Sequence, residues 1–288
     1  MRRFRSGNST AVALVLGAAC SVQAGAAVAK SLFPAFGPPG VVFLRLLFGS
    51  AALWAIARPA LRGRDRADLR LVAALGVVLV SMNVTFYEAI DRLPLGIAVT
   101  VEFLGPLAVA VLGSRRALDL VWVALAAGGV ALLADAGGRE VRPLGILFAA
   151  AAGFCWALYI LLGIRVGRAF SGATGLAPAM VLGAVLIAPW GLVSSWHHLR
   201  EPQLVGASVG VGLLSSAVPW SLELEAMRRL SSYVFGVVLS LEPAVAALSG
   251  FVLLHEHLRT RSWIAIGLVV LASAGSAMRR PDAVPRDV

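Results

Sequence analysis

Long apolar stretches alternate with short polar segments along the whole chain of 288 residues. Runs without Asp, Glu, Lys or Arg cover residues 6–29, 143–164, 169–199 and 202–222. A membrane-spanning helix requires about 20 largely apolar residues. The pattern predicts an all-α membrane protein with ten transmembrane helices, at residues 10–28, 40–57, 71–90, 95–113, 119–134, 144–164, 175–195, 204–222, 232–254 and 262–278.

The composition favours a membrane protein over a soluble or a nucleic-acid-binding one. Charged residues make up 14% of the chain, whereas a soluble domain has about 25%. The net charge of +10 comes from arginines that lie between the apolar runs and not on one face, so nucleic-acid binding is excluded. Cys20 and Cys155 lie inside predicted spans, and the four histidines lie in loops without ligand spacing. No disulfide, metal or cofactor is therefore expected.

The positions of Lys and Arg predict that both termini are cytoplasmic. With the N-terminus inside, 17 of these residues fall in inside segments and 7 in outside loops, while Arg45 lies within a span. Positive residues are enriched on the cytoplasmic side. A single lysine, Lys30, against 24 arginines is typical of a GC-rich bacterial genome. A multi-pass protein of the bacterial inner membrane is therefore expected.

A cleaved signal peptide is an alternative interpretation of the N-terminus. Residues 2–5 are rich in arginine, an apolar stretch follows, and residues 21–24 resemble a cleavage site with small residues. Cleavage would leave nine spans and break the repeat described next, so ten spans are preferred.

The two halves of the chain share a repeat at an offset of 137 residues. Residues 88–113 align without a gap to residues 225–250, with 9 identities in 26 positions, among them Pro106 over Pro243. Five spans per half is an odd number, so the second half would be inverted, as in many secondary transporters whose substrate binds between the repeats. The expected units are two five-helix repeats and a disordered cytoplasmic tail, at 1–138, 139–279 and 280–288.

Three charged residues, Arg45, Glu102 and Glu242, lie near the middle of predicted spans. Such a charge costs about 2.5 to 3.5 kcal/mol on translocon-based scales, so these side chains should face the interior of the bundle. A carboxyl group there can bind and release a proton, which makes both glutamates candidate proton carriers. A structural ion pair between Arg45 and a glutamate is the alternative.

The two glutamates occupy related positions in the repeat. Glu102 aligns with Leu239, so Glu242 is offset from it by three residues, or about one turn on the same helical face. Gly105 and Pro106 follow on the face of Glu102, where small residues would let a helix or a substrate approach closely. Each half thus directs one carboxylate towards the pseudo-symmetric centre.

Polar and aromatic residues on two other spans are further candidates for a cavity lining. Asn83 and Tyr87 lie four residues apart, and Trp156 and Tyr159 lie three apart, so each pair shares a helical face. Aromatic faces suit an ammonium group. Interfacial anchoring and hydrogen bonds between helices are the alternative roles. No nucleophile, phosphate-binding loop or ATPase motif occurs in the sequence, so transport would depend on a gradient.

Five stretches of the chain carry a family likeness. They are AKSLFP at 29–34, PLGIAVTVEFLGPLAVAVLGSRRALDLVWV at 94–123, GFCWALYI at 153–160, PWSLE at 219–223 and FGVVLSLEPAVAALSG at 235–250. The chain resembles the EamA-type exporters of the drug/metabolite transporter superfamily, and among them most closely the threonine/homoserine exporters. It departs from the family pattern where His255 precedes Glu256, because the family usually has a small residue there.

The resemblance implies a proton-linked carrier that exports small amino acids from a site between the halves. Glu102, Glu242 and Lys30 fall within the matching stretches, and Arg45 lies in the adjoining span, so all four are candidate substrate- or proton-binding residues. The expected partners are a small-molecule substrate, protons and the lipid bilayer, and a homodimer is left open. An exporter of another metabolite or of a drug is the nearest alternative. A scaffold or an intramembrane enzyme fits less well, since the spans offer only carboxylates, one arginine and scattered hydroxyls.

Overall fold

The computed structural model describes residues 2–60, 63–112, 119–134, 142–230 and 232–277. Within these ranges the chain forms helices and turns and no β-strand. The α-helices are α1 (Arg2–Ser31), α2 (Phe33–Ala57), α3 (Arg66–Arg92), α4 (Leu95–Glu102), α5 (Leu104–Leu112), α6 (Asp119–Ala134), α7 (Pro143–Ala169), α8 (Leu176–Ser195), α9 (Pro202–Gly212), α10 (Val218–Met227), α11 (Ser232–Leu239), α12 (Glu242–Leu254) and α13 (Thr260–Ala277). The shorter elements are the 3₁₀ turns η1 (Gly172–Thr174) and η2 (Trp196–His198) and the π-helical segment η3 (Leu213–Ala217).

Nine helical segments of the described chain are long and apolar enough to cross a membrane. The expectation of an all-α membrane protein is therefore confirmed. The predicted fifth span corresponds to α6, whose 16 residues are fewer than the about 20 that a crossing requires. The flanking residues of α6, 113–118 and 135–141, lie outside the described residues, as does the tail at 280–288. The ten-span arrangement stays a prediction.

Three predicted spans are interrupted helices and not continuous ones: α4–α5, α9–η3–α10 and α11–α12. In each case a proline lies just beyond the interruption, and its ring nitrogen has no hydrogen to donate to the carbonyl four residues earlier. The carbonyls that lose this bond belong to Glu102 before Pro106, Ser215 before Pro219 and Leu239 before Pro243. The first and third interruptions occupy equivalent positions of the 137-residue repeat.

The π-helical segment η3 adds one residue to the helical path just before Pro219. There the Val218 N–H donates to the carbonyl of Leu213, five residues earlier instead of four. One extra residue turns the following helix by about 100°. Such π-bulges occur frequently at functional sites, and this one determines which face of α10 points inward.

A second local departure occurs at the start of α2. Gly37 has a φ of 63°, in the left-handed region that glycine enters without steric cost, and Pro38 and Pro39 follow it. The helix is therefore kinked at this point, and the predicted span at 40–57 corresponds to the part of α2 beyond the kink.

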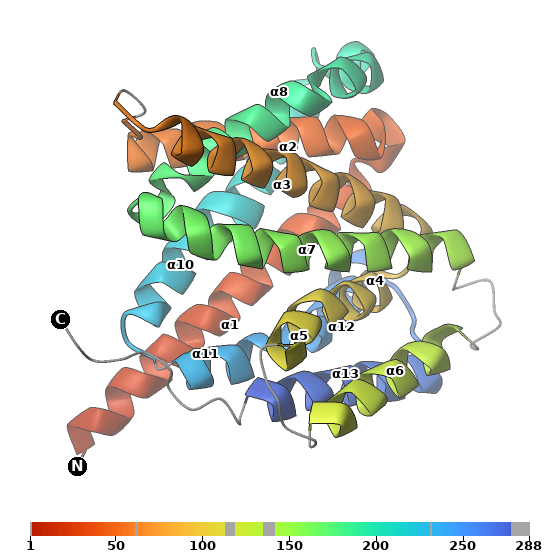
Figure 1. Cartoon of the computed structure of the whole chain (residues 1–288). Coiled ribbons are helices and arrows are strands. Elements are labelled where there is room, and N and C mark those ends of the chain that lie inside the picture. The colour runs from red at the N-terminus through yellow and green to blue at the C-terminus, as the bar shows by residue number, and fades with distance from the viewer. Residues whose placement is uncertain (1, 61–62, 113–118, 135–141, 231, 278–288) are drawn as a thin grey trace.

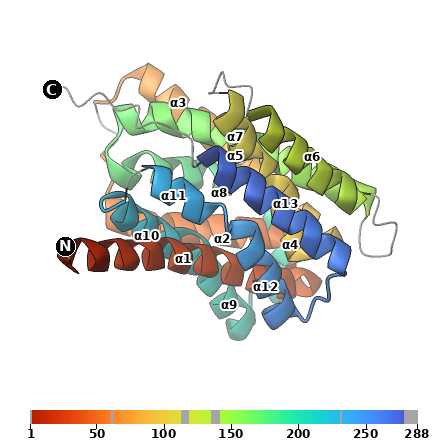
Figure 2. The same cartoon turned by 90° about the horizontal axis from the view of Figure 1, so that it is seen from below.

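The principal helix contacts join the part of the chain before residue 135 to the part after residue 141. Across this division α2 packs against α8, α3 against α7, α1 against α10, α4 against α12 and α6 against α13. Figures 1 and 2 both show α6 and α13 side by side, and Figure 1 shows α3 running along α7. Helices from the two parts therefore interleave, and the main apolar core contains residues of both.

Helix α7 also packs against α4 and α5, close to Glu102. A Cβ atom on Gly105 would clash with the main chain of Gly153 on α7, and a Cβ on Gly153 would clash with the carbonyl oxygen of Glu102. Both positions therefore require glycine, since the two backbones are in direct contact. The close approach predicted from the small residues beside Glu102 is confirmed.

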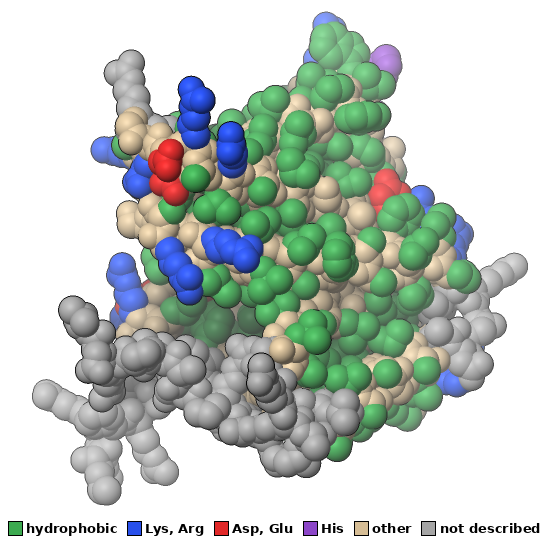
Figure 3. Space-filling view, in the orientation of Figure 1, with side chains coloured by type: hydrophobic (Ala, Val, Ile, Leu, Met, Phe, Trp, Pro, Cys, Tyr) green, Lys and Arg blue, Asp and Glu red, His purple; other side chains and the backbone are tan. Residues whose placement is uncertain are grey.

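The molecular surface is apolar where it would face lipid. Figure 3 shows hydrophobic side chains covering the middle of one face, over α3 and α7, with Lys and Arg side chains towards the edge where α3 begins and α7 ends. The first turn of α3 carries the exposed Arg66, and the last turn of α7 carries the exposed Arg168. An apolar band with basic residues at its border is typical of a membrane protein.

Candidate functional site

A cavity of ≈ 280 Å³ lies between helices of the two parts of the chain. Its polar and charged lining residues are Gln23, Arg45, Asn83, Glu102, Ser215, Ser216, Glu223 and Glu242. Its aromatic lining residues are Phe86, Trp156, Tyr159, Trp220 and Phe235. Six of the eight residues predicted from the sequence are therefore brought together here: Arg45, Asn83, Glu102, Trp156, Tyr159 and Glu242.

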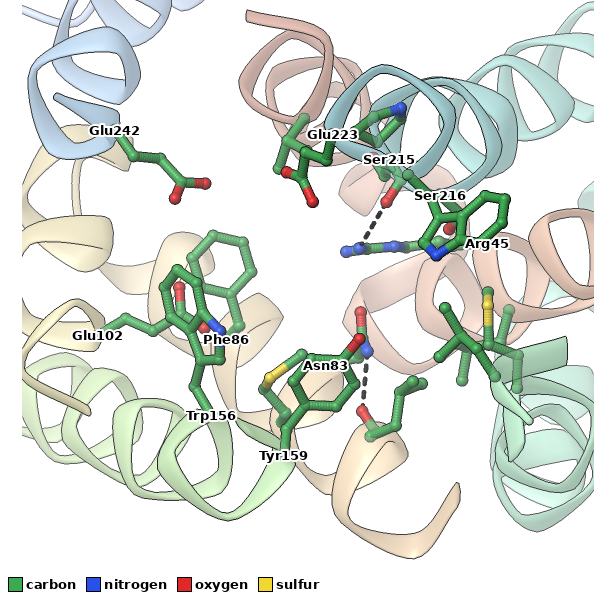
Figure 4. Close-up of a pocket in the computed structure, with 18 of the residues that line it drawn as sticks. Arg45, Asn83, Phe86, Glu102, Trp156, Tyr159, Ser215, Ser216, Glu223 and Glu242 are labelled. Carbon is green, nitrogen blue, oxygen red and sulfur yellow. Dashed lines mark hydrogen bonds between the residues drawn. The ribbon is translucent and has the colours of Figure 1, made fainter. Parts of the chain in front are cut away.

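Arg45 projects from α2 into the cavity and is held by two uncharged acceptors (Figure 4). Its Nη1 donates to the Tyr87 hydroxyl at 3.2 Å, and its Nη2 donates to the Ser215 carbonyl at 3.2 Å. That carbonyl is available because Pro219 cannot donate to it. Among the described residues no carboxylate lies within 4.0 Å of the guanidinium, so the ion pair with a glutamate considered from the sequence is absent from this part of the structure.

Glu102 and Glu242 are both buried, with 7% and 8% of their surface exposed. Glu102 is the last residue of α4, and Glu242 is the first residue of α12. Each glutamate adjoins a helix break: the predicted helical face of Glu102 with Gly105 and Pro106 is interrupted at Phe103, whereas Glu242 and Ala246 lie on one helix. Glu242 also accepts a hydrogen bond from Gln23 Nε2 at 3.2 Å, and the helix N-terminus favours its negative charge.

The charged groups divide the cavity into two sides. Figure 4 shows the Arg45 guanidinium on one side and the carboxylates of Glu102 and Glu242 on the other. Three buried polar atoms of lining residues have no hydrogen-bond partner in the described structure: Arg45 Nε, Gln23 Oε1 and Ser215 Oγ. Buried polar atoms are nearly always satisfied, so these three atoms carry hydrogen-bonding capacity that the described side chains leave unused.

Aromatic rings on α7 complete the wall near the carboxylates. Trp156 and Tyr159 both line the cavity, as their three-residue spacing predicts. The Trp156 ring packs edge-to-face on Phe103, with ring centroids 5.5 Å apart. Phe103 is the residue between α4 and α5, so the break beside Glu102 also positions the indole ring.

Residues 143–278 match the EamA-like transporter family. The threonine/homoserine exporter RhtA of Escherichia coli (strain K12) is 42% identical over 270 residues, which cover 93% of this chain and 91% of that protein. The chain belongs to the EamA-like transporter family.

Other relatives agree with this membership. The threonine/homoserine exporter RhtA of Salmonella typhimurium (strain LT2) is 40% identical over 283 residues, covering 96% of this chain and 95% of that protein. The uncharacterized inner membrane transporter YedA of Escherichia coli (strain K12) is 25% identical over 247 residues, covering 81% and 80%. The sequence resemblance is thus confirmed, and so is the expectation of a transporter of small molecules and not an enzyme.

A solved crystal structure shares the fold of this EamA-like transporter. The two structures superpose with a TM-score of 0.62 at 20% sequence identity, over 94% of this chain and 97% of the other. At that level of identity the likeness establishes the architecture alone.

Glu223 is a cavity carboxylate of this EamA-like transporter that the sequence reasoning missed. It lies on α10 and lines the cavity with Glu102 and Glu242. The predicted eighth span ended at residue 222, which placed Glu223 outside the membrane. A continuous α-helix would also have pointed it elsewhere, because η3 rotates α10. Its place in the PWSLE stretch was the signal that could have revealed it.

Lys30 and Tyr87, the other two predicted site residues, do not line the cavity. Tyr87 is fully buried and meets the site through Phe86, whose ring centroid lies 5.9 Å from its own, and through Arg45, whose Cζ lies 5.5 Å from the centroid of its ring. Lys30 Nζ lies 2.7 Å from Glu256 Oε1 and donates to the Leu93 carbonyl at 2.8 Å.

The Lys30–Glu256 ion pair links the two parts of this transporter. Glu256 Oε2 also accepts from the Leu95 N–H at 2.8 Å, so the pair ties the end of α1, the start of α4 and the turn after α12 together. His255 in that turn has a φ of 55°, in the left-handed region. Glycine is usual at such a helix C-terminus, because it enters the left-handed region without steric cost.

Proposed function

We propose that this transporter exports small amino acids of the threonine and homoserine kind across the bacterial inner membrane, by proton antiport with alternating access. The observation that carries the proposal is the separation of charge in the cavity, with Arg45 facing Glu102 and Glu242 (Figure 4). An amino-acid zwitterion has complementary groups. Its carboxylate would bind the guanidinium, which is suited to bidentate contacts, and its ammonium group would face the carboxylates and the aromatic rings.

The size of the cavity favours an amino acid over a drug. Pockets for drug-sized ligands have volumes of about 300–1,000 Å³, and this cavity of ≈ 280 Å³ lies at the lower boundary of that range, where a small ligand fits best. Relatives at 40% and 42% identity that are named threonine/homoserine exporters support the same choice. An exporter of another small, polar metabolite remains the second candidate.

The alternating-access mechanism follows from two five-helix repeats, 1–138 and 139–279, of opposite orientation. Two pairs of helix contacts support this pseudo-symmetry, because α1, α2 and α3 correspond to α7, α8 and α9–α10 in the repeat. The contact of α3 with α7 is equivalent to that of α10 with α1, and the contact of α2 with α9 is equivalent to that of α8 with α3. The equivalent breaks after Glu102 and Leu239 support it as well. Broken helices between inverted repeats are a common site of substrate and ion binding in secondary transporters.

Both termini of this ten-span arrangement would be cytoplasmic. Alkaline phosphatase fused to either end should be inactive, and green fluorescent protein fused to either end should fluoresce, because the former requires the periplasm and the latter the cytoplasm. Opposite results at the two ends would mean an odd number of spans and would contradict the inverted repeat.

Transport itself can be tested in inside-out membrane vesicles with an acidic lumen. Labelled threonine or homoserine should accumulate in the lumen, and a protonophore should prevent it, because protons leaving the lumen drive the substrate inward. A panel of labelled amino acids identifies the preferred substrate. Failure of all of them would eliminate amino-acid export, whereas uptake that ignores the pH gradient would eliminate antiport alone.

Glu102→Gln and Glu242→Gln are matched variants for the same assay. Glutamine keeps the shape of the side chain but binds no proton. A variant that accumulates substrate as well as the wild type would exclude that glutamate as a proton carrier.

A further inference from the structure

Three carboxylates from three different helices face the cavity in a definite order. Glu242 on α12, Glu102 on α4 and Glu223 on α10 all line this cavity. Figure 4 shows the Glu242 carboxylate directed across the cavity towards Glu223, with Glu102 below Glu242 on the same side of the view. Glu242 is therefore the middle member of the series.

The burial of the three groups changes along this order. Glu102 and Glu242 are buried, whereas Glu223 is half-buried. Glu223 also lies close to one end of the membrane-spanning segment: α10 ends four residues later, at Met227, and four residues of helix span about 6 Å. The exposed Arg228 that follows belongs to a segment expected in the cytoplasm. Glu223 thus stands between the buried carboxylates and the cytoplasmic side.

The surroundings of Glu223 leave its carboxylate free to gain and lose a proton. It forms no hydrogen bond or ion pair with another described residue, so no salt bridge has to break when its charge changes. The titratable groups that it faces are Glu242 and Tyr159, and Tyr159 projects from α7. The Arg45 guanidinium lies on the same side of the cavity (Figure 4), but it is bonded to Tyr87 and Ser215 and forms no ion pair with Glu223 among the described residues.

We propose that Glu223 is the residue through which protons leave the cavity for the cytoplasm. This inference rests on the proposed proton antiport. The proton moves from the Glu242 carboxyl group to the Glu223 carboxylate through cavity water, breaking an O–H bond at Glu242 and forming one at Glu223. Glu223 then releases it to cytoplasmic water and is ionised again. The cavity is polar and large enough to hold bridging water.

The test separates proton movement from substrate movement. Exchange of labelled for unlabelled threonine at equal pH requires the carrier to cycle with substrate but moves no net proton. Accumulation driven by a pH gradient requires proton release in each cycle. In Glu223→Gln, the rate of accumulation should fall by about 100-fold, the lower end of the range for loss of a group that transfers protons, while exchange falls by no more than about threefold.

Two further variants serve as controls. Glu225→Gln changes a glutamate on the same helix that is exposed and pairs with Arg229, so both activities should match the wild type. Glu223→Asp keeps a titratable group and should recover accumulation in part. Retained exchange in each variant also shows that the protein is folded and inserted.

The outcomes distinguish the inference from the proposed function. If Glu223→Gln accumulates substrate like the wild type, or loses exchange and accumulation to the same extent, Glu223 is not a proton exit. If the wild type exchanges threonine but never responds to the pH gradient, the antiport proposal fails and this inference fails with it.

Discussion

Replacing Arg45 by glutamine should reduce threonine transport at least about 30-fold. Among the described residues that line the cavity, Arg45 carries the only positive charge, and its guanidinium is held in place by two hydrogen bonds. Losing one partner of a buried, hydrogen-bonded charge pair costs about 2–5 kcal/mol, and 1.4 kcal/mol is a tenfold change. Initial rates of exchange in vesicles over a range of threonine concentrations would measure the loss.

Two matched variants make the Arg45 experiment specific. Arg45→Lys keeps the charge but not the planar fork, so it should recover little activity if the carboxylate is bound in a bidentate manner. Tyr87→Phe removes one of the two acceptors that hold Arg45 and should cost roughly 1 kcal/mol, or about fivefold. Equal activity of the lysine variant and the wild type would mean that Arg45 contributes charge alone.

Reversing the charge of Lys30 should strongly impair the transporter, and reversing Glu256 as well should restore it in part. Lys30→Glu places two carboxylates in contact, where an ion pair now joins the two parts of the chain. Breaking a buried pair costs about 3–5 kcal/mol. The side chains here are 23% and 15% exposed, so about 1–3 kcal/mol is the appropriate range. Thermal unfolding in detergent and threonine exchange would both record the effect.

The double variant Lys30→Glu/Glu256→Lys can restore only part of the loss. A lysine at position 256 re-forms the ion pair but cannot accept the hydrogen bond from the Leu95 N–H. Glu256→Gln is the complementary control, since its amide oxygen retains that acceptor and loses the charge. A double variant no better than Lys30→Glu alone would show that the ion pair is unimportant and that Glu256 acts through Leu95.

The sequence predicted most of the helices and most of the cavity. Hydropathy located the spans because a membrane helix must hide its backbone and present apolar side chains along its whole length. The cost of a buried charge was sufficient to predict that Arg45, Glu102 and Glu242 face the interior, and all three line the cavity.

The sequence did not predict the helix breaks or the contacts that depend on them. Hydropathy averages over a span and does not register where a proline removes a hydrogen bond, so Glu102 was placed on one continuous helical face with Gly105 and Pro106. The π-helical turn is a local distortion with no compositional signature, which is why Glu223 was missed. The partner of Lys30 is 226 residues away in sequence, and only the folded chain brings the two together.

The prolines that interrupt three spans have a consequence for how this protein can be dissected. Part of the polarity at its centre resides in the peptide bonds of Glu102, Ser215 and Leu239, which survive any truncation of a side chain. An alanine scan of the lining would leave these dipoles in place, among them the Ser215 carbonyl that holds Arg45, and would miss their contribution. Substituting the prolines themselves returns an amide hydrogen to each site, which can then bond the carbonyl four residues earlier.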